Sequence, residues 1–564
     1  MMLQVISKKF FKSNNYHKTE VKTIIYSNVN LFHKIETEIA VLTNIETYNG
    51  ITTYLLTFEN VLEYQKDPKF QLVSVGEGEI IADLLACFSF YFNGVFSSDK
   101  NFIDNLIRSE RQNVCDKSVP QKLLPEIFKR NIYITEDKSS DFNGFIKNLI
   151  GLPNEQYMKV IGSIKQLKDS IITINYNLEL AYTMMVAAVE SLSTSVDGYE
   201  TKWEDCLTQN NRRKRLTSVL ENFKIDDSDE IKKIIIEDTH AKLGMRYRMF
   251  ILKYISNKYY EETVGENILK CKESQLVKAI NNSYQLRSSY IHALERLPNL
   301  IEHSGEAEVY NQDNNLFFTF NGLARITIFV IKEFIYAQQK VEKEDINYMN
   351  KLPETINVMM ASEYWIDNQE GYSIESSMKY YQGLLEFVSK GEYKENGFIR
   401  LNEVCNKIER LIKGENNKNK KIPLVSFYFI YNNLVIEECK CKNEAKFCEK
   451  HEDILEVPCI ENAMIYIVFG AKFPWNIDIL NDIYNKYDSS RYQKNTIRIP
   501  NKLEVCYMLE CANIAFHEGR DDILEKFIIK AFKESAGDKY IQEIYYNFKN
   551  NNKYDVIKWH EQFI

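Results

Sequence analysis

Arg287 and His292 are the two residues of this chain whose types and spacing best suit chemistry. They lie in the segment SQLVKAINNSYQLRSSYIHALERLP (274–298), in which apolar residues recur at helical spacing. On such a helix Arg287 falls within the apolar stripe, where a guanidinium is costly unless an anion meets it. The stripe comprises Leu276, Ile280, Tyr284, Ile291 and Leu294. His292 lies about 140° further round the helix and about 7.5 Å along it, a gap that a long guanidinium can bridge toward a shared phosphate.

This pair suits the cleavage of RNA without a metal. RNA carries its own nucleophile, the 2′-hydroxyl group, and an imidazole can take its proton or protonate the leaving oxygen. A guanidinium offers forked donors to the charge that develops on the phosphorus. The alternative interpretation is structural: Arg287 would be buried and paired to a carboxylate such as Glu190, and His292 would be an ordinary surface histidine.

The sequence around the pair resembles a known family. Arg287-Ser288-Ser289-Tyr290-Ile291-His292 fits the Arg-x4–6-His motif of HEPN domains, which are helical ribonucleases of prokaryotic immunity and toxin systems. Upstream, LELAYTMMVAAVESLSTSVDGYETKWEDC (178–206) resembles the first helix and following turn of the Apea-like HEPN branch. The resemblance covers residues 160–340, about a third of the chain. Ser288 departs from the Asn, Asp or His that often follows the arginine, although serine can still hydrogen-bond a phosphate.

The resemblance implies a helical bundle that cleaves cellular RNA, with tRNA as one candidate substrate, in anti-phage defence by abortive infection. It implies that Arg287 and His292 are the catalytic residues, and we expect Ser288 and Glu190 to support them. It also implies a homodimer that joins two Arg/His pairs, and a phage-derived protein is the kind of activator we would expect. A scaffold that binds RNA or dimerises without catalysis, on a degenerate bundle, is the alternative function.

A cysteine cluster follows residue 438 and has the ligand types of a zinc site. Zinc prefers four thiolate or imidazole ligands in a tetrahedron, and four protein ligands would leave no open position for catalysis. The sequence therefore predicts a structural zinc ion held by four of five residues: Cys439, Cys441, Cys448, and either His451 or Cys459. Incidental reduced thiols are the alternative, since eleven cysteines are spread along the chain.

The charge balance excludes some classes of protein. A formal net charge of −8 argues against a general nucleic-acid coat protein, which needs a broadly basic surface. A short basic run, Arg212-Arg213-Lys214-Arg215, could hold RNA locally, although a solvated charge run is the commoner meaning. No signal peptide or apolar stretch of membrane-spanning length is recognisable, so we expect a cytoplasmic protein with no membrane partner.

The pattern along the chain predicts a mainly α protein in three parts. Residues 1–153 should form an α/β, β-rich sensor or regulatory domain, with a hairpin at Asn49-Gly50. Residues 154–340 should form the HEPN-like helical bundle, with one long amphipathic helix through 164–192 and a buried helix at 315–340. Residues 341–564 should be helical, with a small zinc-bearing β module, similar to a zinc ribbon, at about 422–473.

Overall fold

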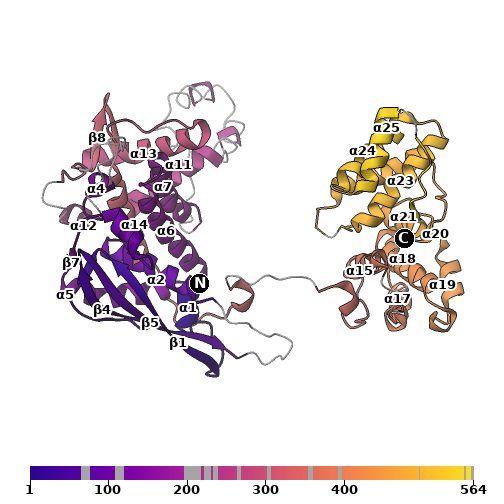
Figure 1. The fold of residues 1–564 in the computed structure, drawn as a ribbon, viewed down its shortest axis with the longest axis horizontal. Helices are drawn as coiled ribbons and strands as arrows, with labels where there is room; N and C mark the ends of the chain where they lie inside the picture. The colour runs from indigo at the N-terminus through magenta and orange to yellow at the C-terminus, as the bar shows by residue number, and fades with distance from the viewer. Residues whose placement is uncertain are drawn as a thin grey trace. The chain divides into compact units, whose positions relative to one another are not determined.

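The computed structural model describes residues 1–64, 76–107, 120–195, 217–220, 230–232, 239–262, 268–301, 306–352, 360–391, 397–494, 496–551 and 554–560. The chain folds as two compact units, Met1–Ile356 and Asn357–Ile564, and each has its own hydrophobic core (Figure 1). The described residues are mainly helical, as the sequence predicts. None of these helices combines the length and the hydropathy that a membrane-crossing segment needs.

The first unit begins with a twisted antiparallel sheet in the order β3-β4-β5-β1-β6. Its longest strands are β1 (Tyr16–Ser27), β4 (Ala40–Tyr48) and β5 (Ile51–Glu63), and β3 (Ile35–Glu36) and β6 (Phe96–Ser97) form its edges. The hairpin predicted at Asn49-Gly50 is confirmed: both residues have positive φ, 50° and 80°, as a tight two-residue turn requires. Strands β2 (Val29–Leu31) and β7 (Ile132–Ile134) form a separate, short parallel sheet.

Helices connect the sheet to the rest of the unit. They are α1 (Met2–Ile6), α2 (Glu77–Phe92), α3 (Lys100–Ile107), α4 (Pro120–Leu123) and α5 (Glu136–Ile150). Helix α2 is buried along most of its length and packs on α6, where Lys165 forms an ion pair with the buried Asp83. One core cluster runs from Met1 to Leu352, so the predicted first and second parts of the chain share a single core.

The prediction of one long helix through 164–192 is wrong, because the structure has two helices there. Helix α6 (Asn154–Thr173) and helix α7 (Leu178–Ser195) are joined by a short turn and pack side by side. The Asn177 side chain accepts a hydrogen bond from the Leu180 backbone N–H at 2.8 Å and caps α7. The apolar spacing continues across this turn, which is why periodicity alone did not reveal it.

The larger helices described in the rest of the first unit are α11 (Thr239–Tyr254), α13 (Glu273–Ala293) and α14 (Phe320–Ala337), with the short α12 (Asn257–Glu261) between α11 and α13. The predicted helix at 315–340 begins later than expected. A hairpin of β8 (Val309–Gln312) and β9 (Asn315–Phe318) comes first, and Thr319 then caps α14. The run NLFFTF therefore forms a strand before it enters the helix. The sequence pattern also predicts a helix at 203–222, and most of this range lies outside the described residues.

In the described part of the second unit all regular elements are helices. Its larger helices are α15 (Ser377–Lys390), α17 (Asn402–Leu411), α18 (Lys418–Leu434), α21 (Ile460–Phe469), α22 (Ile477–Ser490), α23 (Asn501–His517), α24 (Asp521–Glu534) and α25 (Lys539–Asn551). The short helices α19 (Glu444–Lys450) and α20 (Glu452–Leu455) follow α18.

The β module predicted at 422–473 is therefore wrong. Within this range the sequence pattern predicts a hairpin at 423–438 and a strand at 465–470, but residues 423–434 belong to α18 and residues 465–469 to α21. Helix α18 is buried on nearly every side, from Ile422 to Asn432. A helix buried all round has no polar face, so its apolar run cannot be told from a strand by periodicity.

Candidate functional site

Helix α13 carries both residues of the Arg-x4-His motif. Its first turn is closed by Gln275, whose side chain accepts a hydrogen bond from the Lys272 backbone N–H at 3.0 Å. The buried residues of α13 are Leu276, Ala279, Ile280 and Ser283, and this side packs on α7, α11 and β9. The helix ends at Ala293, and Leu294 follows in the left-handed conformation. The motif thus occupies the last two turns of α13.

Arg287 is paired to Glu190 of α7. The Arg287 Nη2 atom lies 3.0 Å from Glu190 Oε2, and the two side chains are only 19% and 9% exposed. The other carboxylate oxygen, Glu190 Oε1, accepts a hydrogen bond from the Tyr284 hydroxyl at 3.1 Å. The anion that an arginine in an apolar stripe requires is therefore supplied from within the unit. This pair is the one that the structural interpretation of the motif names.

Tyr284 and its neighbours hold the Glu190 carboxylate in place. The Tyr284 ring lies against Tyr247 of α11, with 5.5 Å between ring centroids, and against the Arg287 guanidinium. Burial, together with the negative charge of Glu190, raises the pKa of Tyr284, so its hydroxyl remains a donor. Gly244 of α11 makes room for this ring, since a Cβ atom there would lie 2.8 Å from Tyr284 Cε1.

His292 lies elsewhere on α13. It is exposed on the last helical turn, whereas Arg287 is turned toward α7 and Ser288 is half-buried between them along the chain. The two motif residues are thus on different sides of the helix, as their spacing of five residues predicts. The Arg287 Nε atom is buried and has no hydrogen-bond partner in the part of the chain that the structure describes.

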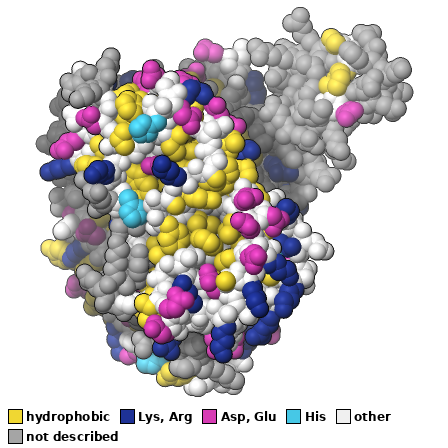
Figure 2. Space-filling view, turned by 90° about the vertical axis from the view of Figure 1, so that its right-hand side faces the viewer, with side chains coloured by type: hydrophobic (Ala, Val, Ile, Leu, Met, Phe, Trp, Pro, Cys, Tyr) yellow, Lys and Arg dark blue, Asp and Glu magenta, His cyan; other side chains and the backbone are white. Residues whose placement is uncertain are grey.

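Two other sequence predictions concern RNA contact. Arg212, Arg213, Lys214 and Arg215 lie outside the described residues. On the face shown in Figure 2, Lys and Arg side chains are interspersed with Asp and Glu around a hydrophobic area. That face therefore carries both signs of charge rather than one broad basic surface, in keeping with the net charge of −8.

The five predicted zinc ligands are spread over helical turns in the second unit. Among the described residues, no three or more His, Cys, Asp or Glu side chains gather closely enough to hold a metal ion. Cys439 ends a short 3-10 turn, Cys448 lies in α19, His451 separates α19 from α20, and Cys459 precedes α21. Zinc binding by these residues remains a prediction.

The sequence did not reveal the neighbour of Cys441. The Cys405 thiol, on α17, hydrogen-bonds Cys441 and lowers the pKa of Cys441. The Cys441 backbone N–H also donates to Asn432 Oδ1 at 2.7 Å. Cys405 lies 36 positions upstream, outside the range of spacing motifs, so only the packing of α17 against α18 brings it there.

Comparison with known proteins adds no name to this site. No family model matches the chain, and neither a curated protein nor a solved structure matches it.

Proposed function

We propose that the helical block 154–340 is a metal-independent endoribonuclease of the HEPN type, with Arg287 and His292 as its catalytic residues. The observation that carries this proposal is the placement of the motif at the end of α13. There a guanidinium is oriented by Glu190 and Tyr284, and an imidazole on the last turn is open to solvent. His292 would move protons between the 2′-hydroxyl, the leaving oxygen and water. Arg287 would stabilise the charge on the phosphorane.

The pair with Glu190 is compatible with this role. A guanidinium has five N–H donors, and the contact at Nη2 uses one of them. The Arg287 side chain is partly exposed, at 19%, so further donors are available to a phosphate. Glu190 would then act as the positioning residue for Arg287, and Ser288 would supply an additional donor near the same phosphate. The expected biological context is the cleavage of cellular RNA in defence against phage.

A non-catalytic scaffold is the second candidate, and the same ion pair favours it. If Arg287 only neutralises Glu190, the helices would serve to dimerise or to bind RNA. Arg287→Lys separates the two proposals, because lysine keeps a positive charge for Glu190 but loses the planar fork that grips a phosphate.

The test measures cleavage of total cellular RNA and of tRNA by the full chain in the presence of EDTA. We expect the wild type to leave 2′,3′-cyclic phosphate ends, and His292→Ala and Arg287→Lys each to lower the rate by at least about a hundredfold. His517→Ala is the matched control, since His517 is also an exposed histidine on the last turn of a helix, α23. Undiminished cleavage in both site variants would contradict the proposal.

The proposed assembly is a homodimer, because one Arg and one His are few groups for the whole reaction and a two-fold axis doubles them. The apolar residues of 164–192 offer no surface for this dimer, because Ile164, Leu167, Met185 and Leu192 are buried within the unit. The support comes instead from α13 itself. Val277 and Ile291 are each 46% exposed, and Leu294 just beyond the helix is 75% exposed.

A further inference from the structure

A polar cavity lies in the first unit, away from the Arg287 site. Its volume is about 420 Å³, which is within the usual range for pockets that take a small organic ligand. Helices α2, α5 and α14 and the end of α12 contribute its lining, which includes Lys138, Arg325, Lys332 and Glu262. Lys138 belongs to α5, whereas Arg325 and Lys332 lie two turns apart on α14. Three cationic side chains thus line one cavity, together with the carboxylates of Glu126 and Glu262.

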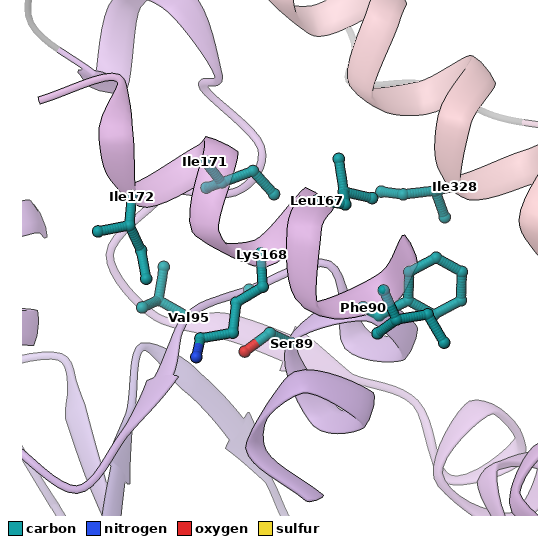
Figure 3. Close-up of a pocket in the computed structure, with 10 residues that line it drawn as sticks. Ser89, Phe90, Val95, Leu167, Lys168, Ile171, Ile172 and Ile328 are labelled. Atoms are coloured by element: carbon teal, nitrogen blue, oxygen red, sulfur yellow. The ribbon is translucent and has the colours of Figure 1, made fainter. Parts of the chain in front are cut away.

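A smaller hollow shares part of this wall. Phe90 and Ile328 line both spaces, and the smaller one, shown in Figure 3, has a volume of only about 10 Å³. Its remaining lining is mostly aliphatic, from Leu167, Ile171 and Ile172 of α6. It is large enough for about one water molecule and has no array of charges. The larger cavity is therefore the one with the chemistry of a binding site.

Arg325 is held rigidly by protein partners. Both guanidinium nitrogens Nε and Nη2 donate to the fully buried carboxylate of Glu308, the latter at 2.8 Å. Its Nη1 donates to the Tyr259 carbonyl oxygen at 2.9 Å, and the guanidinium stacks over the Tyr259 ring at 3.7 Å. Arg325 is thus neutralised and fixed, and it gives the cavity one immobile wall.

Lys332 and Lys138 differ from Arg325 because they have no such partners. Neither ammonium group forms an ion pair or a hydrogen bond with a described residue, and Lys332 Nζ lies over the Tyr91 ring, 4.7 Å from its centroid. Burial and the charge of Lys138 lower the pKa of Lys332 to about 8, and burial lowers the pKa of Lys138 as well. The charge of Glu262 offsets only part of this cost at either lysine. Among the described residues no carboxylate, Glu126 and Glu262 of the lining included, lies within ion-pair distance of either ammonium group, so the cavity can take an anion at the two lysines.

Asn93, which ends α2 in the left-handed conformation, also lines the cavity. A volume of about 420 Å³ is larger than a phosphate group needs, so the occupant should also carry an organic part. Phe90 and Phe329 provide apolar wall for that part.

We propose that this cavity binds a small phosphorylated organic molecule, with its phosphate on Lys138 and Lys332 and its organic part toward Asn93, Phe90 and Phe329. A phosphate dianion matches two lysines better than a single carboxylate does, since it brings two charges and several acceptor oxygens. The size of the cavity suits a sugar phosphate or a nucleoside monophosphate. This site is separate from α13, so it does not depend on the proposed ribonuclease.

The test is calorimetric titration of the full chain with four probes: AMP, ribose 5-phosphate, adenosine and inorganic phosphate. We expect AMP or ribose 5-phosphate to bind at least about tenfold more tightly than inorganic phosphate, and AMP at least about tenfold more tightly than adenosine. Lys332→Met and Lys138→Met should each lower the affinity for the phosphorylated probe about tenfold or more. Lys147→Met is the matched control, because Lys147 is an exposed lysine on α5. The Lys147→Met variant should bind the phosphorylated probe as tightly as the wild type.

A measurement on the wild type guards against misfolded variants. Lys332 should react with acetic anhydride near neutral pH, because its low pKa leaves more free amine, and millimolar phosphorylated probe should protect it in peptide mass spectra. Three outcomes overturn the proposal: no phosphorylated probe binds or protects at millimolar concentration, adenosine binds as tightly as AMP, or inorganic phosphate binds as tightly as both organic phosphates.

Discussion

The Arg287 guanidinium on α13 lies 3.0 Å from the Glu190 carboxylate on α7, so the arginine of the Arg-x4-His motif forms an ion pair with an earlier helix of the same unit. The contact fixes where the guanidinium points, and it makes the two helices depend on each other. A structural pair and a catalytic pair share this geometry. They differ in what the loss of each partner does to stability and to chemistry.

The first prediction concerns that pair. Glu190→Gln should lower the free energy of unfolding by about 3 kcal/mol, because a largely buried guanidinium loses its counter-charge. Glu190→Gln combined with Arg287→Met should cost less than the sum of the two single changes, since the stranded charge is removed as well. Urea denaturation of the four proteins measures this coupling. Costs that simply add would show that the contact contributes no net coupling to stability.

The second prediction concerns Gly244, which lies against the Tyr284 ring. In Gly244→Ala the new methyl group would meet Tyr284 Cε1 at 2.8 Å, so the ring must shift and loosen its hydrogen bond to Glu190. We expect a loss of about 1 to 3 kcal/mol in unfolding free energy and reduced RNA cleavage. Gly162→Ala on α6 is the control, because nothing lies within 4 Å of its Cβ position. Alanine there should be neutral or stabilise the helix by up to about 1 kcal/mol.

Local signals predicted part of this fold. Asn49-Gly50 specified its hairpin because the two residues tolerate the positive φ that the turn needs. The break between α6 and α7 was missed because apolar spacing runs through it, although Asn177 is a helix-capping residue type. Strands were predicted where the structure has helix α18. This prediction was wrong because a helix that is buried on all sides lacks the polar positions that would reveal helical periodicity.

The two sites differ in how far the sequence could reveal them. Arg287 was recognisable because a single helix carries the arginine and its apolar stripe, and Glu190 was named as the carboxylate in the structural alternative. The cavity had no such signal. Lys138 and Lys332 are 194 positions apart, and each is ordinary in its own helix. Only tertiary packing shows that neither ammonium group is paired to a carboxylate among the described residues.

The third prediction follows from Lys332. Its pKa in the folded chain is about 8, below the usual 10.5, so the folded state binds its proton less well than the unfolded state. Below pH 8 the charged Lys332 therefore lowers the free energy of unfolding by its full amount, and between pH 8 and about 10.5 this destabilisation decreases as the pH rises. Lys332→Met should therefore stabilise the protein at pH 7 by about 1 to 3 kcal/mol and flatten that pH dependence. Thermal unfolding of the wild type and the variant at pH 7, 8 and 9 measures the stabilisation and its pH dependence. A variant that is less stable than the wild type at pH 7 would contradict the prediction.

The fourth prediction concerns zinc. If the sequence pattern is right, purified protein contains one zinc ion per chain, and Cys439→Ser combined with Cys441→Ser removes it. Cys405→Ser is the control, since Cys405 touches Cys441 but is not a predicted ligand. Metal analysis by mass spectrometry decides. A metal-free protein, or zinc that survives the double change, would leave these cysteines as reduced thiols in a helical unit.

The fifth prediction concerns the dimer and its shared site. On one α13 the exposed His292 and the inward Arg287 lie on different sides, so one chain presents them poorly to a single phosphate. A second copy related by a two-fold axis could place its His292 near the first Arg287. Mixed Arg287→Ala and His292→Ala chains should then regain part of the cleavage that each variant lacks, because every heterodimer keeps one complete pair.

The exposed apolar residues of α13 make this prediction specific. Val277 and Ile291 are two heptads apart on the helix and each 46% exposed, so a second copy could cover them together. Val277→Glu combined with Ile291→Glu should give a folded monomer with little cleavage, whereas Ile479→Glu, on an exposed residue of the second unit, should leave both assembly and activity intact. Light scattering on an actively cleaving wild-type sample is the decisive measurement: a mass of one chain would rule out the shared site, and the two motif residues would then have to act within a single protomer.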